Sequence, residues 1–295
     1  MFERTIKKRV EATGIGLHSG QVIKLILEPL ESKSGIIFYH AKSGVEIPLH
    51  PKNITETKLA TTLGLKPNAV STIEHFLSAI YAYGIDNLKV TIVGDEMPIM
   101  DGSAMPFCML LDEAGVVLQQ APKEVIVIKK EIKIEEDGKM ASLKPSKKAK
   151  FNFLIDFPHP IIGKEKFSFE FTKQNFIEQI ARARTFGFVR DIQYLQSMNL
   201  ALGASLDNAI GLDENSVLNP DGLRFSDEFV RHKILDAMGD MMVLGKTVIG
   251  EYNAIASSHD LNHKLTLKLL ETANAYEVVS LSDYQESLEL AKVFA

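Results

Sequence analysis

The chain has 295 residues, 45% of them hydrophobic and 24% charged, which is enough for one large or two medium globular domains. Its formal net charge of −5 argues against nucleic-acid binding, because neutralising phosphates requires clustered Lys and Arg in excess. A single cysteine, Cys108, excludes an internal disulfide framework and a thiolate zinc cluster, and so favours a reducing compartment. No apolar run reaches the roughly 20 residues of a membrane span, and the N-terminus lacks a signal-peptide core. We therefore expect a cytoplasmic protein.

Residues 5–28 show the alternation of strands on either side of a glycine-rich stretch, TGIGLHSGQ. The residues that follow Gly20, VIKLILEP, are again a strand pattern, whereas a dinucleotide-binding fingerprint must open a helix. The sequence therefore predicts a tight turn between two strands. His18 lies in this turn, and its neighbours alone indicate a structural role. Residues 31–70 are predicted to form short strands and turns.

The stretch STIEHFLSAIYAYG predicts a helix with Ser71 as its N-cap and Gly84 at its C-terminal end. Glu74 and His75 fall outside the apolar face of this helix, next to small residues that leave room for another helix or a ligand. Ser71 and Glu74 also have the spacing of a capping box, in which the carboxylate returns to the N-cap amide. The residues alone favour that structural role for Glu74.

Residues 85–115 predict a buried strand, an acidic turn and a helix from about Ser103 to Gly115. Three carboxylates near the turn could bind a cation, although such groups more often cap helices and turns: Asp95, Glu96 and Asp101. Alternating strands begin again near Leu118–Pro122, so we place a boundary between domains 1–121 and 122–295. The second half repeats the order of strands before helices, which indicates two similar α+β halves. An apolar, glycine-punctuated insertion at about 191–218 is too irregular for a core helix.

Residues 229–245, FVRHKILDAMGDMMVLG, predict an amphipathic helix with a broad apolar arc. Its narrow polar side holds His232, Lys233, Asp236 and Asp240, with Gly239 between them. His232 and Asp236 are four residues apart, so an imidazole and a carboxylate lie side by side over one turn, which suits a shared metal ion. A solvated helix face remains the simpler alternative.

A strand followed by a helix is predicted from GEYNAIASSHDLNHKLTLKLLETAN. His259 lies at the junction, just before the helix, where functional side chains concentrate on a rigid scaffold. His263, one turn into the helix, is predicted to be a surface residue.

Six motifs taken together resemble those of the zinc-dependent UDP-3-O-acyl-N-acetylglucosamine deacetylases of lipid A biosynthesis. They occur in the same order between about Arg4 and Leu270: GIGLHSG, STIEHF, PIMDGSAMPF, RARTFGF, DGLRFSDEFVRHKILDAMGD and SSHDLNHKL. The resemblance implies an α+β protein of two similar domains, each a β-sheet packed on helices. The helix layers would lie face to face, with the active site in the cleft.

The resemblance also implies a role for particular residues. Three of them would bind Zn²⁺: His75, His232 and Asp236. Four would act in catalysis, with Glu74 as general base, His259 as the protonated acid, Asp240 as its partner and Thr185 polarising the carbonyl. Three would lie near the polar part of the substrate: Lys233, His18 and Phe186. No family function corresponds to His263.

An acylated sugar brings a hydrocarbon chain that must be sheltered from water, and each buried CH₂ is worth about 0.8 kcal/mol. The apolar insertion offers suitable side chains, among them Leu200 and Leu202. We expect these residues to bind the acyl chain, although they could instead simply cover a sheet.

Two imidazoles and one carboxylate leave an open coordination position, as in catalytic zinc sites. Zinc would lower the pKa of a bound water toward about 7, Glu74 would accept its proton, and acetate and a free amine would result. Another zinc amidohydrolase, a non-haem iron enzyme with the same ligand types, and a non-enzymatic binding module remain as alternatives. The expected partner is a small acylated UDP-sugar, and the acyl length and the oligomeric state stay open.

Overall fold

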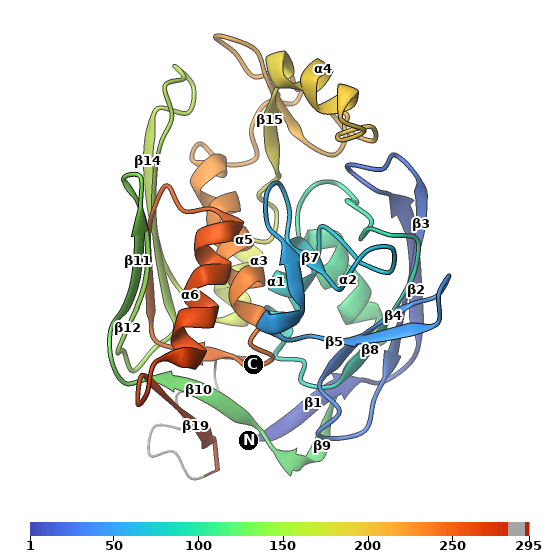
Figure 1. Ribbon diagram of the computed structural model, residues 1–295, viewed down its shortest axis with the longest axis vertical. Helices are drawn as coiled ribbons and strands as arrows, with labels where there is room; N and C mark the ends of the chain where they lie inside the picture. The colour runs from blue at the N-terminus through green and yellow to red at the C-terminus, as the bar shows by residue number, and fades with distance from the viewer. Residues whose placement is uncertain (283–292, 295) are drawn as a thin grey trace.

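Two five-stranded sheets lie on opposite flanks of the molecule, with helices between them (Figure 1). The computed structural model describes residues 1–282 and 293–294. The first sheet has the order β2 (Val10–Ile15), β3 (Val22–Pro29), β8 (Leu88–Val93), β4 (Ile36–His40) and β5 (Val45–Pro48). The second has the order β11 (Ile132–Glu136), β12 (Lys139–Lys144), β18 (Glu251–Ile255), β13 (Lys150–Asp156) and β14 (Lys164–Glu170).

The two sheets share one topology. In each sheet the central strand, β8 or β18, is the one that comes last in the sequence. It pairs antiparallel with β3 or β12 on one side and parallel with β4 or β13 on the other. In β3, Ile23, Leu25 and Leu27 are buried on one side, as the period-2 alternation of a strand requires. The expectation of two similar α+β halves is confirmed. The turn between β2 and β3 carries Gly16, Gly20 and His18, as predicted, while Gly14 lies within β2.

Two helices meet between the sheets, α1 (Glu74–Tyr83) from the first half and α5 (Glu228–Met242) from the second (Figure 1). Every residue of α1 is buried, and Leu235 and Met238 of α5 are completely buried. Burying side chains of this size contributes about 1.5–3 kcal/mol each. A Cβ at Gly239 would collide with the backbone carbonyl of Glu74, so glycine allows the helices to approach closely.

The polar side of α5 is not a solvated face. His232, Asp236 and Asp240 are all buried, because this side of α5 packs toward α1 and toward α6 (His259–Glu271). The helix also ends at Met242 rather than at Gly245, because Gly245 adopts a left-handed conformation (φ 72°) and its N–H bonds to the Met242 carbonyl. In the first half, α2 (Met105–Ala114) packs on α1, and its residue Cys108 is buried, as expected.

Short elements complete the fold. They are β1 (Phe2–Ile6) paired with β9 (Val116–Pro122), β10 (Glu124–Ile128) between β17 (Val248–Ile249) and β19 (Tyr276–Ser280), β6 (Ile54–Glu56) paired with β7 (Thr62–Leu63), β15 (Phe186–Phe188) paired with β16 (Ile210–Leu212), the 3-10 helix η1 (Pro51–Asn53), and α3 (Lys173–Gln179). The proposed division at 121/122 falls at the end of β9. Among the described residues, no helix combines the length and apolar character that crossing a membrane would need.

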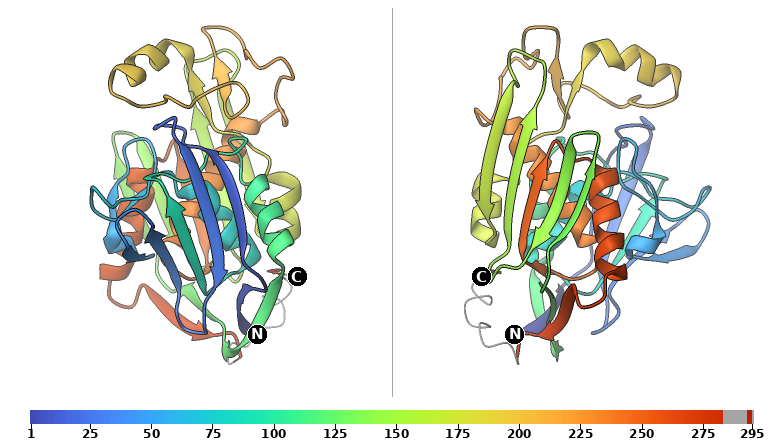
Figure 2. Two further views of the ribbon diagram at one scale, coloured as in Figure 1. Left: turned by 90° about the vertical axis from the view of Figure 1, so that its right-hand side faces the viewer. Right: turned by 60° about the vertical axis from the view of Figure 1, so that its left-hand side comes forward.

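The insertion at 191–218 is more regular than its composition suggests. Its first part forms most of a helix, α4 (Val189–Ser197), which lies above the end of the first sheet in both views of Figure 2. Ile192 and Leu195 are three residues apart and both are partly buried, so they mark one side of this helix. No residue of α4 is fully buried, so α4 belongs to the surface rather than to the core.

Candidate metal centre

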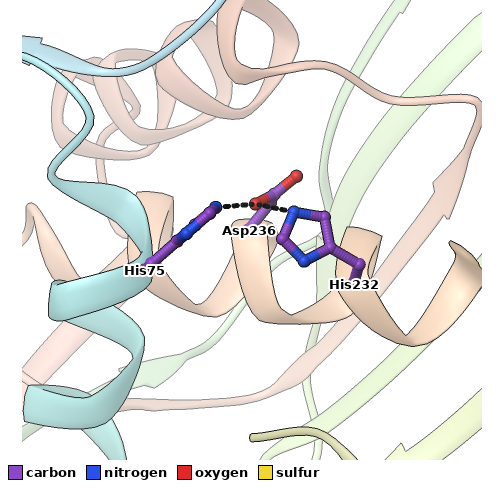
Figure 3. Close-up of side chains that lie close together, drawn as sticks. All are labelled: His75, His232 and Asp236. Atoms are coloured by element: carbon purple, nitrogen blue, oxygen red, sulfur yellow. Dashed lines mark ion pairs between the residues drawn. The ribbon is translucent and has the colours of Figure 1, made fainter. Parts of the chain in front are cut away.

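His75, His232 and Asp236 converge where α1 meets α5 (Figure 3). Their potential ligand atoms all lie within 4.8 Å of one another. The Asp236 Oδ1 is 3.5 Å from His75 Nε2 and 3.3 Å from His232 Nε2. The one-turn spacing on α5 brings two of these side chains together, and the packing of α1 against α5 supplies the third.

The donor atoms fit a divalent metal ion. Asp236 Oδ1 is buried without a hydrogen-bond donor, although both imidazoles face it. His232 donates from Nδ1 to the Ala183 carbonyl at 3.0 Å, and this bond leaves its Nε2 as the free electron-pair donor. Burial lowers the pKa of His232 to about 4, against the opposing effect of Asp236, so its imidazole is neutral. Nitrogen and carboxylate donors in this combination suit zinc.

Lys233 bonds to the other oxygen of the same carboxylate, with 2.6 Å between its Nζ and Asp236 Oδ2. Burial raises the pKa of Asp236, but His232 and Lys233 outweigh burial and hold this pKa well below its usual range. Asp236 is therefore an anion, as a metal ligand must be.

Glu74 does not form the predicted capping box. The N-cap of α1 is Ile73, and no side chain caps the helix. Ser71 instead donates its N–H to the Asp95 carbonyl, and Thr72 bends the chain through a left-handed conformation (φ 59°) before the helix starts. The Glu74 carboxylate accepts a bond from Thr61 N at 3.0 Å, and burial raises the pKa of Glu74.

His259 is the first residue of α6 rather than a residue of the preceding loop, and Ser258 is the N-cap. Its Nδ1 donates to Asp240 Oδ2 at 2.9 Å, and its Nε2 lies 3.9 Å from Glu74 Oε1. Burial lowers the pKa of His259, but Asp240 and Glu74 outweigh burial and raise it to about 9. This imidazole therefore holds a proton near neutral pH.

A buried ion pair of the adjacent residue Arg184 holds the segment with Thr185 and Phe186 against α5. Arg184 bonds to Glu228, at the start of α5, with 2.9 Å between Nε and Oε1. The Phe186 ring packs on Phe229 of α5, with centroids 5.0 Å apart. The motif RARTFGF thus docks on the helix that carries His232.

A cavity of about 410 Å³ opens beside the candidate metal ligands. Six predicted site residues line it: Thr185, Phe186, His232, Lys233, Asp236 and His259. It is also lined by Lys58, Lys139, Asp156 and Phe157, which the sequence analysis did not identify. No motif marks these four, because they come from a loop after β6, the start of β12 and the end of β13, which only the fold brings together.

A second cavity, also of about 410 Å³, shares Lys58 and Leu59 with the first. His18 and Leu200 line it. Leu202 lies beside the β2–β3 turn, where its backbone N–H donates to the His18 carbonyl, and its side chain is 47% exposed.

The three acidic residues considered as a cation site have other partners. Asp95 pairs with His40, Glu96 accepts bonds from the N–H groups of His18 and Ser19, and Asp101 pairs with Arg224. Glu96 thereby fixes the turn that carries His18. His263 is partly buried rather than a surface residue.

The chain matches the model of the family described as UDP-3-O-acyl N-acetylglycosamine deacetylase over residues 3–271. It is 58% identical to the UDP-3-O-acyl-N-acetylglucosamine deacetylase of Sulfurimonas denitrificans over 295 residues, the full length of both proteins. It is 55% identical to the protein of that name from Campylobacter fetus subsp. fetus, again over the full length of both. Identity to the protein of that name from Wolinella succinogenes is 54%, over all of this chain and 99% of that relative.

Proposed function

The chain belongs to the UDP-3-O-acyl N-acetylglycosamine deacetylase family, and we propose that it hydrolyses the acetamide of UDP-3-O-acyl-N-acetylglucosamine as a zinc enzyme of lipid A biosynthesis. One observation carries this proposal. A buried carboxylate and a protonated imidazole, Glu74 and His259, lie next to three side chains that are suited to a zinc ion. His232, Asp236 and His259 of this group line one cavity. An acid and a base beside a metal are what amide hydrolysis requires.

We assign the zinc ligands as His75, His232 and Asp236. A zinc ion held there would supply an activated water and would polarise the amide carbonyl. Glu74 accepts the proton from the attacking water, since its Oε1 is the carboxylate oxygen that accepts no hydrogen bond from Thr61. Its raised pKa makes it a better base than an exposed glutamate, because basicity follows pKa.

His259 is the proton donor to the leaving amine. Its Nδ1 is bound to Asp240, so the proton it gives up is the one on Nε2, which faces Glu74. Thr185, which lines the same cavity, is assigned to the amide carbonyl oxygen, and Phe186 to the sugar ring.

We assign the two cavities to the two ends of the substrate. Lys58, Lys139 and Lys233 line the first cavity and would attract the diphosphate as positive charges. The second is lined by apolar residues that include Leu59 and Leu200, and also by charged residues that include Glu56 and Lys66, and we assign it to the acyl chain. His18, expected near the polar part of the substrate, lines this second cavity instead of the first. Leu202 is not among the residues that line this cavity, so its contact with the acyl chain stays a prediction. The cytoplasmic location stays a prediction.

The decisive experiment measures metal content and acetate release from the acylated UDP-sugar with the same purified protein. We expect one zinc ion per chain, loss of activity after chelation, recovery with zinc, and no requirement for oxygen. Release of acetate and of free amine in equal amounts would identify amide hydrolysis. Full activity after removal of the metal would refute the assignment of zinc, and oxygen-dependent turnover would favour the iron alternative.

A further inference from the structure

Thr61 lies immediately before β7 and uses its three backbone and side-chain polar groups at the active site. Its N–H donates to Glu74 Oε2 at 3.0 Å, and its hydroxyl donates to Asp240 Oδ1 at 2.6 Å. Its carbonyl accepts the N–H of Ile73, the N-cap of α1, at 3.3 Å. One residue therefore contacts the proposed base, the carboxylate that holds the proposed acid, and the start of the helix that carries the base.

The bond to Asp240 leaves this carboxylate a single orientation. Its Oδ2 accepts bonds from His259 Nδ1 at 2.9 Å and from Asn262 Nδ2 at 2.8 Å, while Oδ1 accepts from Thr61 and from no other described residue. Without the hydroxyl, Oδ1 would be a buried anion oxygen without a donor, and the carboxylate would rotate to find one. Rotation would move Oδ2 away from His259, because the two oxygens of a carboxylate are rigidly linked.

The bond to Glu74 has the same effect on the base. Thr61 N holds Oε2, and this leaves Oε1 directed toward His259 at 3.9 Å. Thr61 is 2% exposed, and its neighbours Ala60 and Thr62 line the second cavity while Thr61 itself does not. Thr61 thus acts on the two catalytic groups without touching the space assigned to the substrate.

We propose that Thr61 is a positioning residue of the deacetylation. It fixes the orientation of the Glu74 carboxylate relative to the Asp240–His259 pair. This inference rests on the proposed function, because it concerns the base and the acid of that reaction. It differs from a purely structural role in one respect. A structural hydroxyl supports the fold alone, whereas a positioning residue changes the catalytic rate at a fixed affinity for substrate.

The test compares Thr61→Val, which has nearly the same shape but no hydroxyl, with Thr61→Ser, which keeps it. The matched control is Thr5→Val, since the Thr5 hydroxyl is also buried and also donates at 2.6 Å, but to the Asn87 carbonyl in a pairing that involves no proposed catalytic group. We expect kcat of Thr61→Val to fall about 10-fold or more, a step typical of losing part of general acid–base catalysis, with KM and zinc content unchanged. Thr61→Ser should recover most of kcat.

Thr5→Val should lower Tm comparably to Thr61→Val but should leave kcat unchanged. Unaltered kcat in Thr61→Val would overturn the inference, and so would a loss that Thr61→Ser fails to recover or that Thr5→Val shares. A rise in KM or a loss of zinc that accounts for the whole effect would also overturn it. If the valine variant does not fold, Thr61→Ala gives the same comparison. Failure of the wild-type protein to release acetate would instead refute the proposed function.

Discussion

Replacing Asp240 with asparagine should move the basic limb of the pH–rate profile to lower pH. His259 must be protonated to act as an acid, so activity is present below its pKa and is lost as pH rises through it. Asp240 is the main cause that raises this pKa to about 9, and burial works in the opposite direction. Asparagine keeps the shape of the side chain and removes the charge, so the pKa should fall toward the ordinary value of about 6.5.

The size of the effect depends on the pH of the assay. A full return to 6.5 is a change of about 2.5 units, or roughly 3.4 kcal/mol at 1.36 kcal/mol per unit. At pH 8 the protonated fraction of His259 would fall from about nine-tenths to about 3%, a loss of up to about 30-fold. At pH 6 about three-quarters of the imidazole would remain protonated in the variant, so protonation alone would cost less than about 1.5-fold. In the variant, burial still lowers this pKa and Glu74 still raises it, so the two effects oppose each other.

The assay is acetate release measured across pH 5–10 for the wild type and for Asp240→Asn. Asp260→Asn is the matched control, because Asp260 is adjacent in sequence but pairs with Lys264 and Thr57. Its removal should leave the basic limb in place. A ratio of variant to wild-type activity that is the same at pH 6 and at pH 8 would refute the pairing of Asp240 with the catalytic acid.

Three further predictions follow from the same site. Glu74→Gln should lower kcat about 10²-fold or more at an unchanged Tm, because it removes the proton acceptor and preserves the shape; near wild-type turnover would exclude Glu74 as the base. His232→Ala should lose zinc, as measured by elemental analysis, because it removes one of three ligands; full occupancy would remove it from the ligand set. Leu200→Asp should weaken binding of the acylated substrate much more than that of an analogue without the acyl chain, as measured by calorimetry, whereas equal losses would make the insertion a scaffold.

The sequence predicted those features that depend on neighbours along the chain. Period-2 alternation identified the strands around the first glycine-rich turn, and helical periodicity identified α5 with His232 and Asp236 one turn apart. The sequence places Gly239 between the polar residues of α5, but only the structure shows that it lies against the Glu74 carbonyl. The family motifs selected the same buried residues that the structure brings together, although no spacing within α1 could show that His75 faces α5.

The spacing of residues along the chain predicts the wrong partner for the Glu74 carboxylate, because a nearby donor and a more distant donor compete for it. The spacing of Ser71 and Glu74 fits a capping box, yet the Glu74 carboxylate accepts its bond from Thr61, thirteen residues earlier in the chain. A buried carboxylate bonds to whichever donor the packing provides, and sequence spacing contains only the local candidates.

The sequence alone determined the central helices, with shifted ends, and many of the strands. It also determined the repeated order of the two halves and the residue types suited to a metal. Only the tertiary structure decided which groups face one another. Lys139 at the edge of β12 and Lys58 in a loop of the other half line one cavity because the halves pack together. Thr61 contacts Asp240 of the other half for the same reason, whereas its contact with Glu74 lies within the first half. Side chains far apart in sequence become neighbours through the burial of α1 against α5, and that packing sets the distances on which proton transfer depends.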